Sequence, residues 1–188
     1  MKILTKDEIN VNKEVILEVM ENGAVFIHPT DTIYGIGCNA NEEEFVNQVR
    51  AIKGRAEAPF SVIAPSKDWI RRNCFVSEEA EKWLEKLPGP YTLILKAKDS
   101  VAKNVAPGME TLGVRIPDHW FSKIVEELGL PVVTTSANRS GGDFMTSLDN
   151  LDDEIKPKIE FIIYEDEKHG RPSKIVDLTG EEVKVKER

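Results

Sequence analysis

The feature that most constrains the fold is a series of short apolar runs separated by segments with helical patterns. The clearest runs cover residues 24–27, 60–64, 91–97, 112–116 and 131–135, and the tail adds 160–164, 174–178 and an alternating pair at Val183 and Val185. Short apolar runs that alternate with helices are typical of α/β proteins. We therefore predict an α/β fold with a twisted, mixed, largely parallel open sheet and flanking helices. No internal repeat or linker divides the chain, so a single domain over residues 1–188 is expected.

Capping residues and apolar spacing predict the helices. Thr5 and Glu8 form a capping box that opens a helix to about Asn22, where Gly23 ends it. The other predicted helices cover residues 41–52 with Asn41 as the cap, two segments capped by Ser66 and Ser77, residues 118–128 capped by Asp118, and a short helix near 148–155.

Composition and charge exclude several classes of protein. No apolar run approaches the roughly 20 residues that span a bilayer, so no membrane contact is expected. Cys38 and Cys74 cannot form a disulfide framework, and no Cys/His spacing indicates a metal site. The net charge of −8 argues against nucleic-acid binding driven by bulk charge. The N-terminus lacks a signal-peptide core, and we expect a cytoplasmic protein.

Two polar clusters follow buried strands. Thr30, Asp31 and Thr32 come directly after the run 24–27 and Pro29, and residues 134–142 follow the run 131–133. Open α/β sheets bind ligands at strand ends of this kind. In the second cluster, Ser136 and Asn138 would offer hydrogen-bonding groups to an anion.

Three cations have positions of chemical interest. Lys53 and Arg55 straddle Gly54 at a helix exit, where they could hold phosphate oxygens or simply be solvated at a helix C-terminus. Arg115 lies inside an apolar strand and therefore needs a partner. That partner could be an internal acid, Asp31 or Asp118, or a ligand carboxylate or phosphate, and we favour the ligand.

Familiar cofactor signatures are missing. The sequence has no GxxxxGK[ST] phosphate loop and no HExxH, and His28, His119 and His169 are scattered, as expected of structural histidines. Residues 35–40 match GxGxxA, but a Thr/Asp/Thr cluster separates them from the strand and cations follow downstream. We therefore reject a dinucleotide-binding loop.

Taken together, the motifs resemble the YrdC-like family, the L-threonylcarbamoyladenylate (threonylcarbamoyl-AMP) synthases of tRNA modification. The matching segments come in the family's order and cover about residues 10–180: they are 29–37 (PTDTIYGIG), 52–55 (IKGR), 59–63 (PFSVI), 88–95 (PGPYTLIL), 113–117 (GVRIP), 134–142 (TTSANRSGG) and 173–177 (SKIVD).

The resemblance implies a concave, positively lined cavity and a nucleotidyltransferase that consumes L-threonine, bicarbonate and ATP with Mg²⁺. The products would be threonylcarbamoyl-AMP and pyrophosphate. No tightly bound cofactor and no covalent nucleophile are implied, and such chemistry depends on positioning and charge stabilisation. The expected downstream partner is the tRNA threonylcarbamoyl transferase complex, and a weak contact with tRNA itself stays open.

The resemblance also assigns roles to individual residues. Lys53 and Arg55 would act as catalytic, phosphate-holding cations. The residues implied to bind threonine are Thr32, Ser61, Arg115, Thr134 and Ser173, with Arg115 holding the substrate carboxylate. The residues implied to bind nucleotide are Lys53, Arg55, Ser136, Asn138, Ser140 and Phe144. The chain departs from the family pattern at Ala56, at residues 142–145 and at Lys174.

Two other functions are compatible with the same fold. One is a non-catalytic RNA-binding module, against which the negative net charge counts. The other is a carbamoyl-adenylate-forming enzyme that uses carbamoyl phosphate in place of threonine, as in the similar domain of hydrogenase-maturation proteins.

Overall fold

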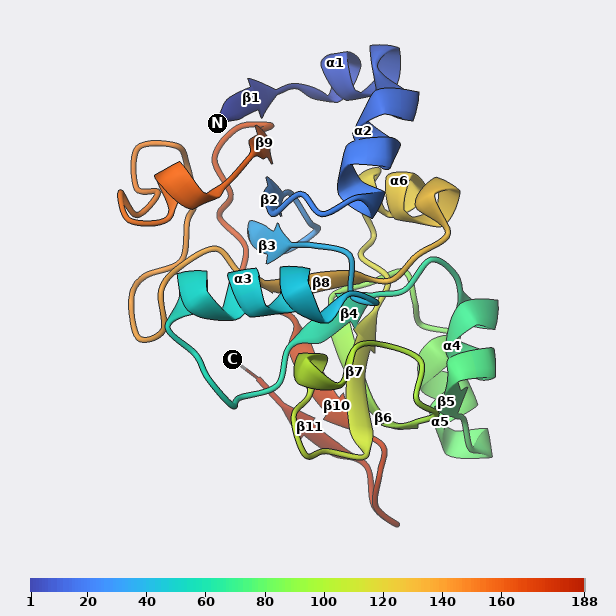
Figure 1. The fold of residues 1–188 in the computed structure, drawn as a ribbon. Helices are drawn as coiled ribbons and strands as arrows, with labels where there is room; N and C mark the ends of the chain where they lie inside the picture. The colour runs from blue at the N-terminus through green and yellow to red at the C-terminus, as the bar shows by residue number, and fades with distance from the viewer. Residues whose placement is uncertain (188) are drawn as a thin grey trace.

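The computed structural model describes residues 1–187 and shows helices on both sides of one long mixed sheet (Figure 1). The strands are β1 (Lys2–Leu4), β2 (Phe26–His28), β3 (Gly35–Gly37), β4 (Ser61–Ile63), β5 (Cys74–Phe75), β6 (Tyr91–Ala97), β7 (Thr111–Arg115), β8 (Val132–Ser136), β9 (Phe161–Ile163), β10 (Lys174–Asp177) and β11 (Lys184–Lys186). The helices are α1 (Lys6–Val11), α2 (Lys13–Glu21), α3 (Glu43–Lys53), α4 (Lys67–Asn73), α5 (Glu78–Leu84) and α6 (Phe121–Leu128), with short 3₁₀ turns at Lys103–Val105 and Lys156–Lys158.

The strand order is β1-β9-β2-β3-β8-β4-β7-β6-β10-β11, with β5 paired to β6. The mixed, open sheet is as predicted, but the expected excess of parallel pairs is absent. Among residues 1–187, four strand pairs are parallel and six are antiparallel. Two of the antiparallel pairs, β2 with β3 and β10 with β11, arise because a short connection returns the chain directly to the neighbouring strand.

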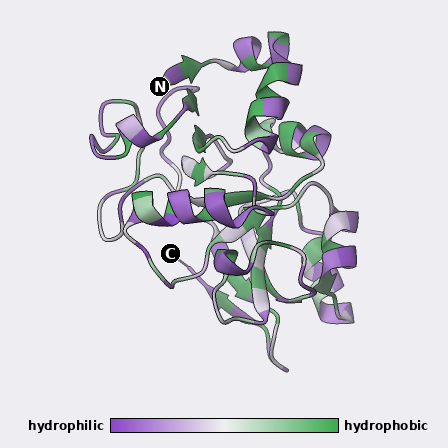
Figure 2. Cartoon of the chain, in the orientation of Figure 1, coloured by the Kyte–Doolittle hydropathy of each residue, from purple (hydrophilic) through white to green (hydrophobic). Residues whose placement is uncertain are grey.

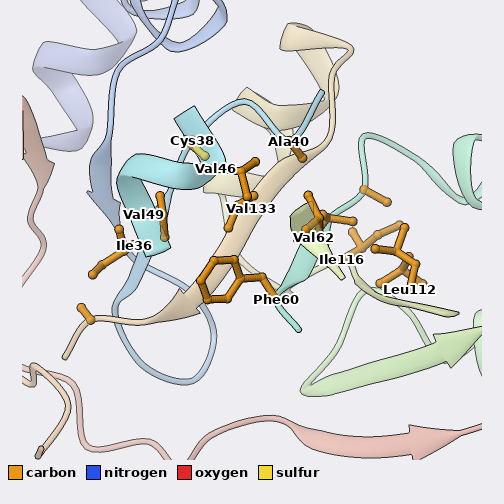
Figure 3. Packing of buried hydrophobic residues seen from close by; sticks show 14 of the residues in the cluster. Ile36, Cys38, Ala40, Val46, Val49, Phe60, Val62, Leu112, Ile116 and Val133 are labelled. Atoms are coloured by element: carbon orange, nitrogen blue, oxygen red, sulfur yellow. The ribbon is translucent and has the colours of Figure 1, made fainter. Parts of the chain in front are cut away.

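One face of the sheet is apolar along its whole middle section. Alternate residues of the central strands, such as Ile36, Val133, Val62 and Val114, point to this face and are fully buried. Helices α3, α4 and α5 cover it (Figure 1), and Figure 3 shows side chains of this cluster between α3 and the strands. Figure 2 shows the same pattern as hydrophobic strands beneath helices with mixed faces.

The opposite face is apolar only over part of its area. Phe26, Val132 and Ile63 pack there against α2 and α6 in a second buried cluster. Further along the same strands, the residues on this face become serine, threonine, glycine and arginine. This change of composition places the candidate site on the polar part of the second face.

Of the five predicted helix caps, Thr5, Ser66 and Ser77 are confirmed, and Asn41 and Asp118 are wrong. Ser66 and Ser77 accept hydrogen bonds from the N–H groups of Trp69 and Ala80, as predicted. Asn41 is not a cap, because Glu42 precedes α3 and the N–H of Asn41 is bound by Asn39 Oδ1 at 3.0 Å.

The predictions for the other helices need three corrections. The capping box of Thr5 is present, but the helix breaks at Asn12 into α1 and α2. Helix α6 begins at Phe121 and not after Asp118, whose N–H donates to Asp31. No α-helix forms at 148–155, because Asn150 and Asp152 accept hydrogen bonds from nearby backbone N–H groups and so favour turns.

The predicted strands are all present within a residue or two, while β1, β3 and β5 were not predicted. Strand β3 consists of Gly35, Ile36 and Gly37, and glycine carries no strand signal. Among residues 1–187, no helix combines the length and apolarity needed to cross a bilayer.

Candidate active site

A cavity of about 240 Å³ opens on the polar part of the second sheet face. It is lined by Thr30, Thr32, Ile33, Tyr34, Gly35, Arg55, Pro59, Phe60, Ser61, Thr92, Arg115, Thr134, Thr135, Ser136, Phe144, Pro172 and Ser173. Among residues 1–187, two arginines and no carboxylates contribute to this lining. A cavity rich in hydroxyl groups with two guanidinium groups is suited to a ligand that carries carboxylate or phosphate oxygens.

Strand register builds the floor of the cavity. Gly35 pairs with Ser136, Thr134 pairs with Ser61, and Ser61 pairs with Gly113, so these residues share one face. Glycine is required at position 113, since a Cβ atom there would lie 2.7 Å from Ser61 Oγ. It is required at Gly35 as well, where a Cβ atom would lie 2.8 Å from the ring of His28. The GxG that resembled a dinucleotide loop is therefore a strand of the cavity floor.

Thr30 organises the turn between β2 and β3. Its Oγ1 accepts hydrogen bonds from the N–H groups of Thr32 and Ile33 at 3.1 and 3.2 Å and lies 2.7 Å from the Ile33 carbonyl oxygen. It also lies 2.9 Å from Thr32 Oγ1. Thr30 is buried, so this single hydroxyl group fixes the position of the Thr32 side chain in the cavity.

We expect Thr30→Val to lower the free energy of unfolding by about 1–3 kcal/mol, because it leaves buried N–H groups without their acceptor. Urea unfolding measures this loss. Thr30→Ser keeps the hydroxyl group and should lose much less. Equal stability of the valine variant and the wild type would contradict the role given to this hydroxyl group.

Arg115 is held by an internal acid. Its Nη2 donates to Asp31 Oδ1 at 2.5 Å, and the other oxygen of Asp31 accepts the N–H of Asp118 at 3.0 Å. Nη1 and Nη2 both lie 3.5 Å from Thr32 Oγ1. Of the partners considered for Arg115, the structure therefore contains Asp31, and the guanidinium also lines the cavity. A ligand carboxylate as a further partner remains a prediction.

Lys53 lies behind the cavity wall and not in it. Its Nζ donates to the carbonyl oxygens of Ser136 and Asn138 at 2.7 and 2.5 Å and to Asn138 Oδ1 at 2.7 Å. Its side chain is only 2% exposed. Burial and the nearby Arg55 lower the pKa of Lys53 to about 8. Lys53 thus holds the turn 136–138 that carries Ser136 into the cavity.

The segment 164–173, which we call the strap, closes the other side of the cavity. Ser173 Oγ lies 2.7 Å from Thr92 Oγ, and both side chains line the cavity. Glu165 anchors the strap by accepting hydrogen bonds from His119 at 2.7 Å, from Trp120 at 2.6 Å and from Lys168. The strap then crosses the 30–33 turn at Gly170.

We expect Gly170→Ala to displace the strap, because a Cβ atom there would lie 2.1 Å from the carbonyl oxygen of Thr32. The expected result is weaker ligand binding at the cavity, which calorimetry with the ligands proposed below measures. Gly180→Ala is the matched control, since its nearest atom would lie 3.8 Å away. Wild-type affinity in the Gly170 variant would show that the strap does not shape the cavity.

Two of the three histidines, His28 and His119, have structural positions, as predicted. His28 is fully buried and stacks on Phe121 with ring centroids 4.8 Å apart. Burial lowers its pKa to about 3, so it stays neutral. His119 anchors the strap, and the side chain of His169 is largely exposed.

The structure brings eleven predicted site residues to one region. Eight of them line the cavity: Thr32, Arg55, Ser61, Arg115, Thr134, Ser136, Phe144 and Ser173. Lys53 and Asn138 lie in the layer behind Ser136. Ser140 is exposed outside the cavity, and its N–H donates to the Lys53 carbonyl oxygen at 3.0 Å.

Sequence reasoning missed several cavity residues. Thr30, Thr92, Phe60 and Pro172 line the cavity but were not named as site residues. Strand alternation contained a signal for Thr92, a buried polar residue in an otherwise apolar run.

The lining carries no nucleophile paired with a base. Burial raises the pKa of both Cys38 and Cys74, to about 11 for Cys74, so neither forms a reactive thiolate. The hydroxyl groups and arginines can bind and orient anionic ligands. Since no carboxylate lines the cavity, a divalent cation there would need most of its ligands from substrate phosphates.

The fold and the cavity define an α/β protein with a hydroxyl-rich cavity, lined also by two arginines, on a polar sheet face. A family model described as "Telomere recombination", the Sua5/yciO/yrdC family, matches residues 18–188. The chain belongs to this family.

Curated relatives and solved structures agree with this assignment. The chain is 36% identical to a putative threonylcarbamoyl-AMP synthase of Methanocaldococcus jannaschii, over 97% of this chain and 90% of the relative. It is 34% identical to the threonylcarbamoyl-AMP synthase of Bos taurus over 75% of this chain, but it spans only about half (51%) of that relative's length.

Two solved structures superpose closely on this fold. Pyrococcus abyssi Sua5, in its complex with L-threonine, gives a TM-score of 0.88 at 29% identity, covering 98% of this chain and 56% of that chain. Escherichia coli YciO gives 0.87 at 21% identity, covering 100% and 94%, and shows the fold alone. The predicted α/β sheet with flanking helices is confirmed by these neighbours.

Proposed function

We propose that this protein is an L-threonylcarbamoyladenylate synthase. It would convert L-threonine, bicarbonate and ATP into threonylcarbamoyl-AMP, pyrophosphate and water. The observation that carries the proposal is the position of Arg115, a guanidinium inside a sheet, held by Asp31 and turned into a cavity lined by hydroxyl groups.

We assign two chemical regions to the cavity from the residues that line it. Arg115 would bind the carboxylate of threonine, and the hydroxyl groups of Thr32, Ser61, Thr134 and Ser173 surround the space for its amine and the carbamate formed there. Arg55 and Phe144 line the cavity with Ser136, which Lys53 and Asn138 support from behind. This second region would bind the phosphates and the nucleoside of ATP.

The proposed reaction suits such a site because it needs few proton transfers from protein groups. The threonine amine takes up CO₂ as a carbamate, and a carbamate oxygen attacks the α-phosphorus as pyrophosphate leaves. The arginines would hold the two reactants in line and offset the negative charge that gathers between them. Mg²⁺ would enter with ATP and balance the charge of its phosphates.

The relatives support this assignment. Several carry the name threonylcarbamoyl-AMP synthase, and a solved relative holds L-threonine. The product would then pass to the tRNA threonylcarbamoyl transferase complex in the cytoplasm. A weak contact of this protein with tRNA belongs to the same proposal.

The test is pyrophosphate release from ATP in the presence of bicarbonate, with and without L-threonine. We expect release to depend on threonine. Release that needs carbamoyl phosphate in place of threonine would assign the carbamoyl-adenylate activity. No release with either substrate would reject the enzyme and favour a binding module.

The pKa of Lys53 predicts a pH dependence. With a pKa of about 8, Lys53 loses its charge as the pH rises through mildly alkaline values, and the turn 136–138 loses its ammonium donor. We expect kcat/KM for ATP, measured at saturating threonine and bicarbonate, to fall as the pH rises through about 8. Lys53→Arg stays protonated and should lack this fall. An identical profile in both proteins would assign the pH dependence to another group.

A further inference from the structure

Arg50 of α3 donates hydrogen bonds to five backbone carbonyl groups. Its Nε donates to the Asn104 carbonyl oxygen at 2.7 Å, and its Nη2 donates to that of Val105 at 3.2 Å. Its Nη1 donates to the carbonyl oxygens of Arg55, Ala56 and Ala58 at 3.0, 3.1 and 3.1 Å. The side chain is only 8% exposed.

These carbonyl groups belong to two segments that have little regular structure of their own. One is the loop 55–59, which leaves α3 after Gly54 and returns to β4. The other is the 3₁₀ turn at 103–105. Arg50 reaches both segments at once, so its guanidinium joins them to α3.

The loop carries groups that line the cavity. Arg55 begins the loop, Pro59 ends it, and Phe60 follows directly before β4. The centroid of the Phe60 ring lies 4.4 Å from the Arg50 guanidinium carbon and 5.8 Å from that of Arg55, so one ring forms cation–π interactions with both cations. The conformation that presents Arg55 to the cavity is therefore built on Arg50.

We propose that Arg50 is a positioning residue that holds the loop 55–59 so that Arg55 faces the phosphate region of the cavity. This inference rests on the proposed function for the identity of the anion, ATP, but not for the loop geometry. Arginine suits the position because its planar fork presents five N–H groups in fixed directions, whereas the ammonium of lysine cannot reach several carbonyl groups on both sides. The carbonyl dipoles also offset the repulsion between the two neighbouring cations.

The first test is a double-mutant cycle of Arg50→Met and Arg55→Met, with exposed Arg72→Met as the control. We expect Arg50→Met to raise the KM for ATP about tenfold and to change the KM for threonine little, while Arg50→Lys has an intermediate effect. In the Arg55→Met background, adding Arg50→Met should leave the KM for ATP almost unchanged, because the guanidinium that Arg50 positions is already gone. An undiminished effect of Arg50→Met in that background would overturn the proposal, as would equal changes in both KM values.

The second test does not depend on enzymatic activity. Limited trypsin digestion, below the unfolding temperature of every variant, measures cleavage after Arg55. We expect faster cleavage there in Arg50→Met and an unchanged rate in Arg72→Met. Unchanged cleavage in the Arg50 variant would overturn the positioning role. Faster cleavage in a protein that releases no pyrophosphate would uphold that role and reject the proposed function alone.

Discussion

Replacing Arg115 with alanine is expected to raise the KM for L-threonine by about 30-fold or more. The guanidinium is buried beside Asp31 and faces the cavity, so it would meet the substrate carboxylate in a site with little water. Removing one partner of a desolvated charge pair costs about 2–5 kcal/mol, and 2 kcal/mol corresponds to about 30-fold. Initial rates of pyrophosphate release over a threonine series measure the change.

Two further variants make this result specific. Arg115→Lys keeps a positive charge but lacks the planar fork of the guanidinium. Its KM for L-threonine should lie between those of the alanine variant and the wild type. Arg72→Ala removes an exposed arginine on α4 and should leave the KM for L-threonine unchanged. If Arg115→Ala keeps the wild-type dependence on threonine, Arg115 does not bind the substrate carboxylate.

Lys53→Met is expected to lower kcat/KM for ATP strongly. Methionine fills the space of the lysine stem but leaves the carbonyl oxygens of Ser136 and Asn138 without their donor. Each buried group left without a partner costs about 1–3 kcal/mol, so stability should fall as well. We expect kcat/KM for ATP to fall at least about 100-fold, the scale on which a single preorganised electrostatic contact acts.

Lys82→Met is the control for this variant, since Lys82 is exposed on α5 and forms an ion pair with Glu79 on the surface. Thermal unfolding of each variant separates loss of folded protein from loss of function. Normal kinetics for ATP in folded Lys53→Met would mean that the turn 136–138 needs no ammonium.

The sequence predicted the strands well because most of them are apolar runs that belong to a buried sheet. It failed at β3, where Gly35 and Gly37 give no strand signal and are needed for close contact with His28 and β8. It failed also at 148–155, where the side chains of Asn150 and Asp152 favour turns over the helix that the spacing indicated. Local propensity describes such segments poorly, because specific hydrogen bonds decide them.

The candidate site was predicted mainly through the family resemblance and in part through physical reasoning about Arg115. An arginine in an apolar strand must have a partner, and Asp31 was one of those considered. Lys53 was expected to contact phosphate, yet it lies behind the wall, since its acceptors come from a turn more than 80 residues away. Arg50 was not predicted at all, because carbonyl acceptors have no sequence signature.

The strap has a consequence for the order in which the site is completed. In the sheet, six strands separate β9 from β10, and the strap that joins them brings Gly170, Pro172 and Ser173 to the cavity. The ribosome makes these residues after all of the strands that form the cavity floor. Because chains fold as they are synthesised from the N-terminus, a nascent chain that stops before residue 170 would have most of its sheet but an open groove in place of a pocket. The pocket would therefore be completed only once residues 170–173 have been made, after most of the folded core exists.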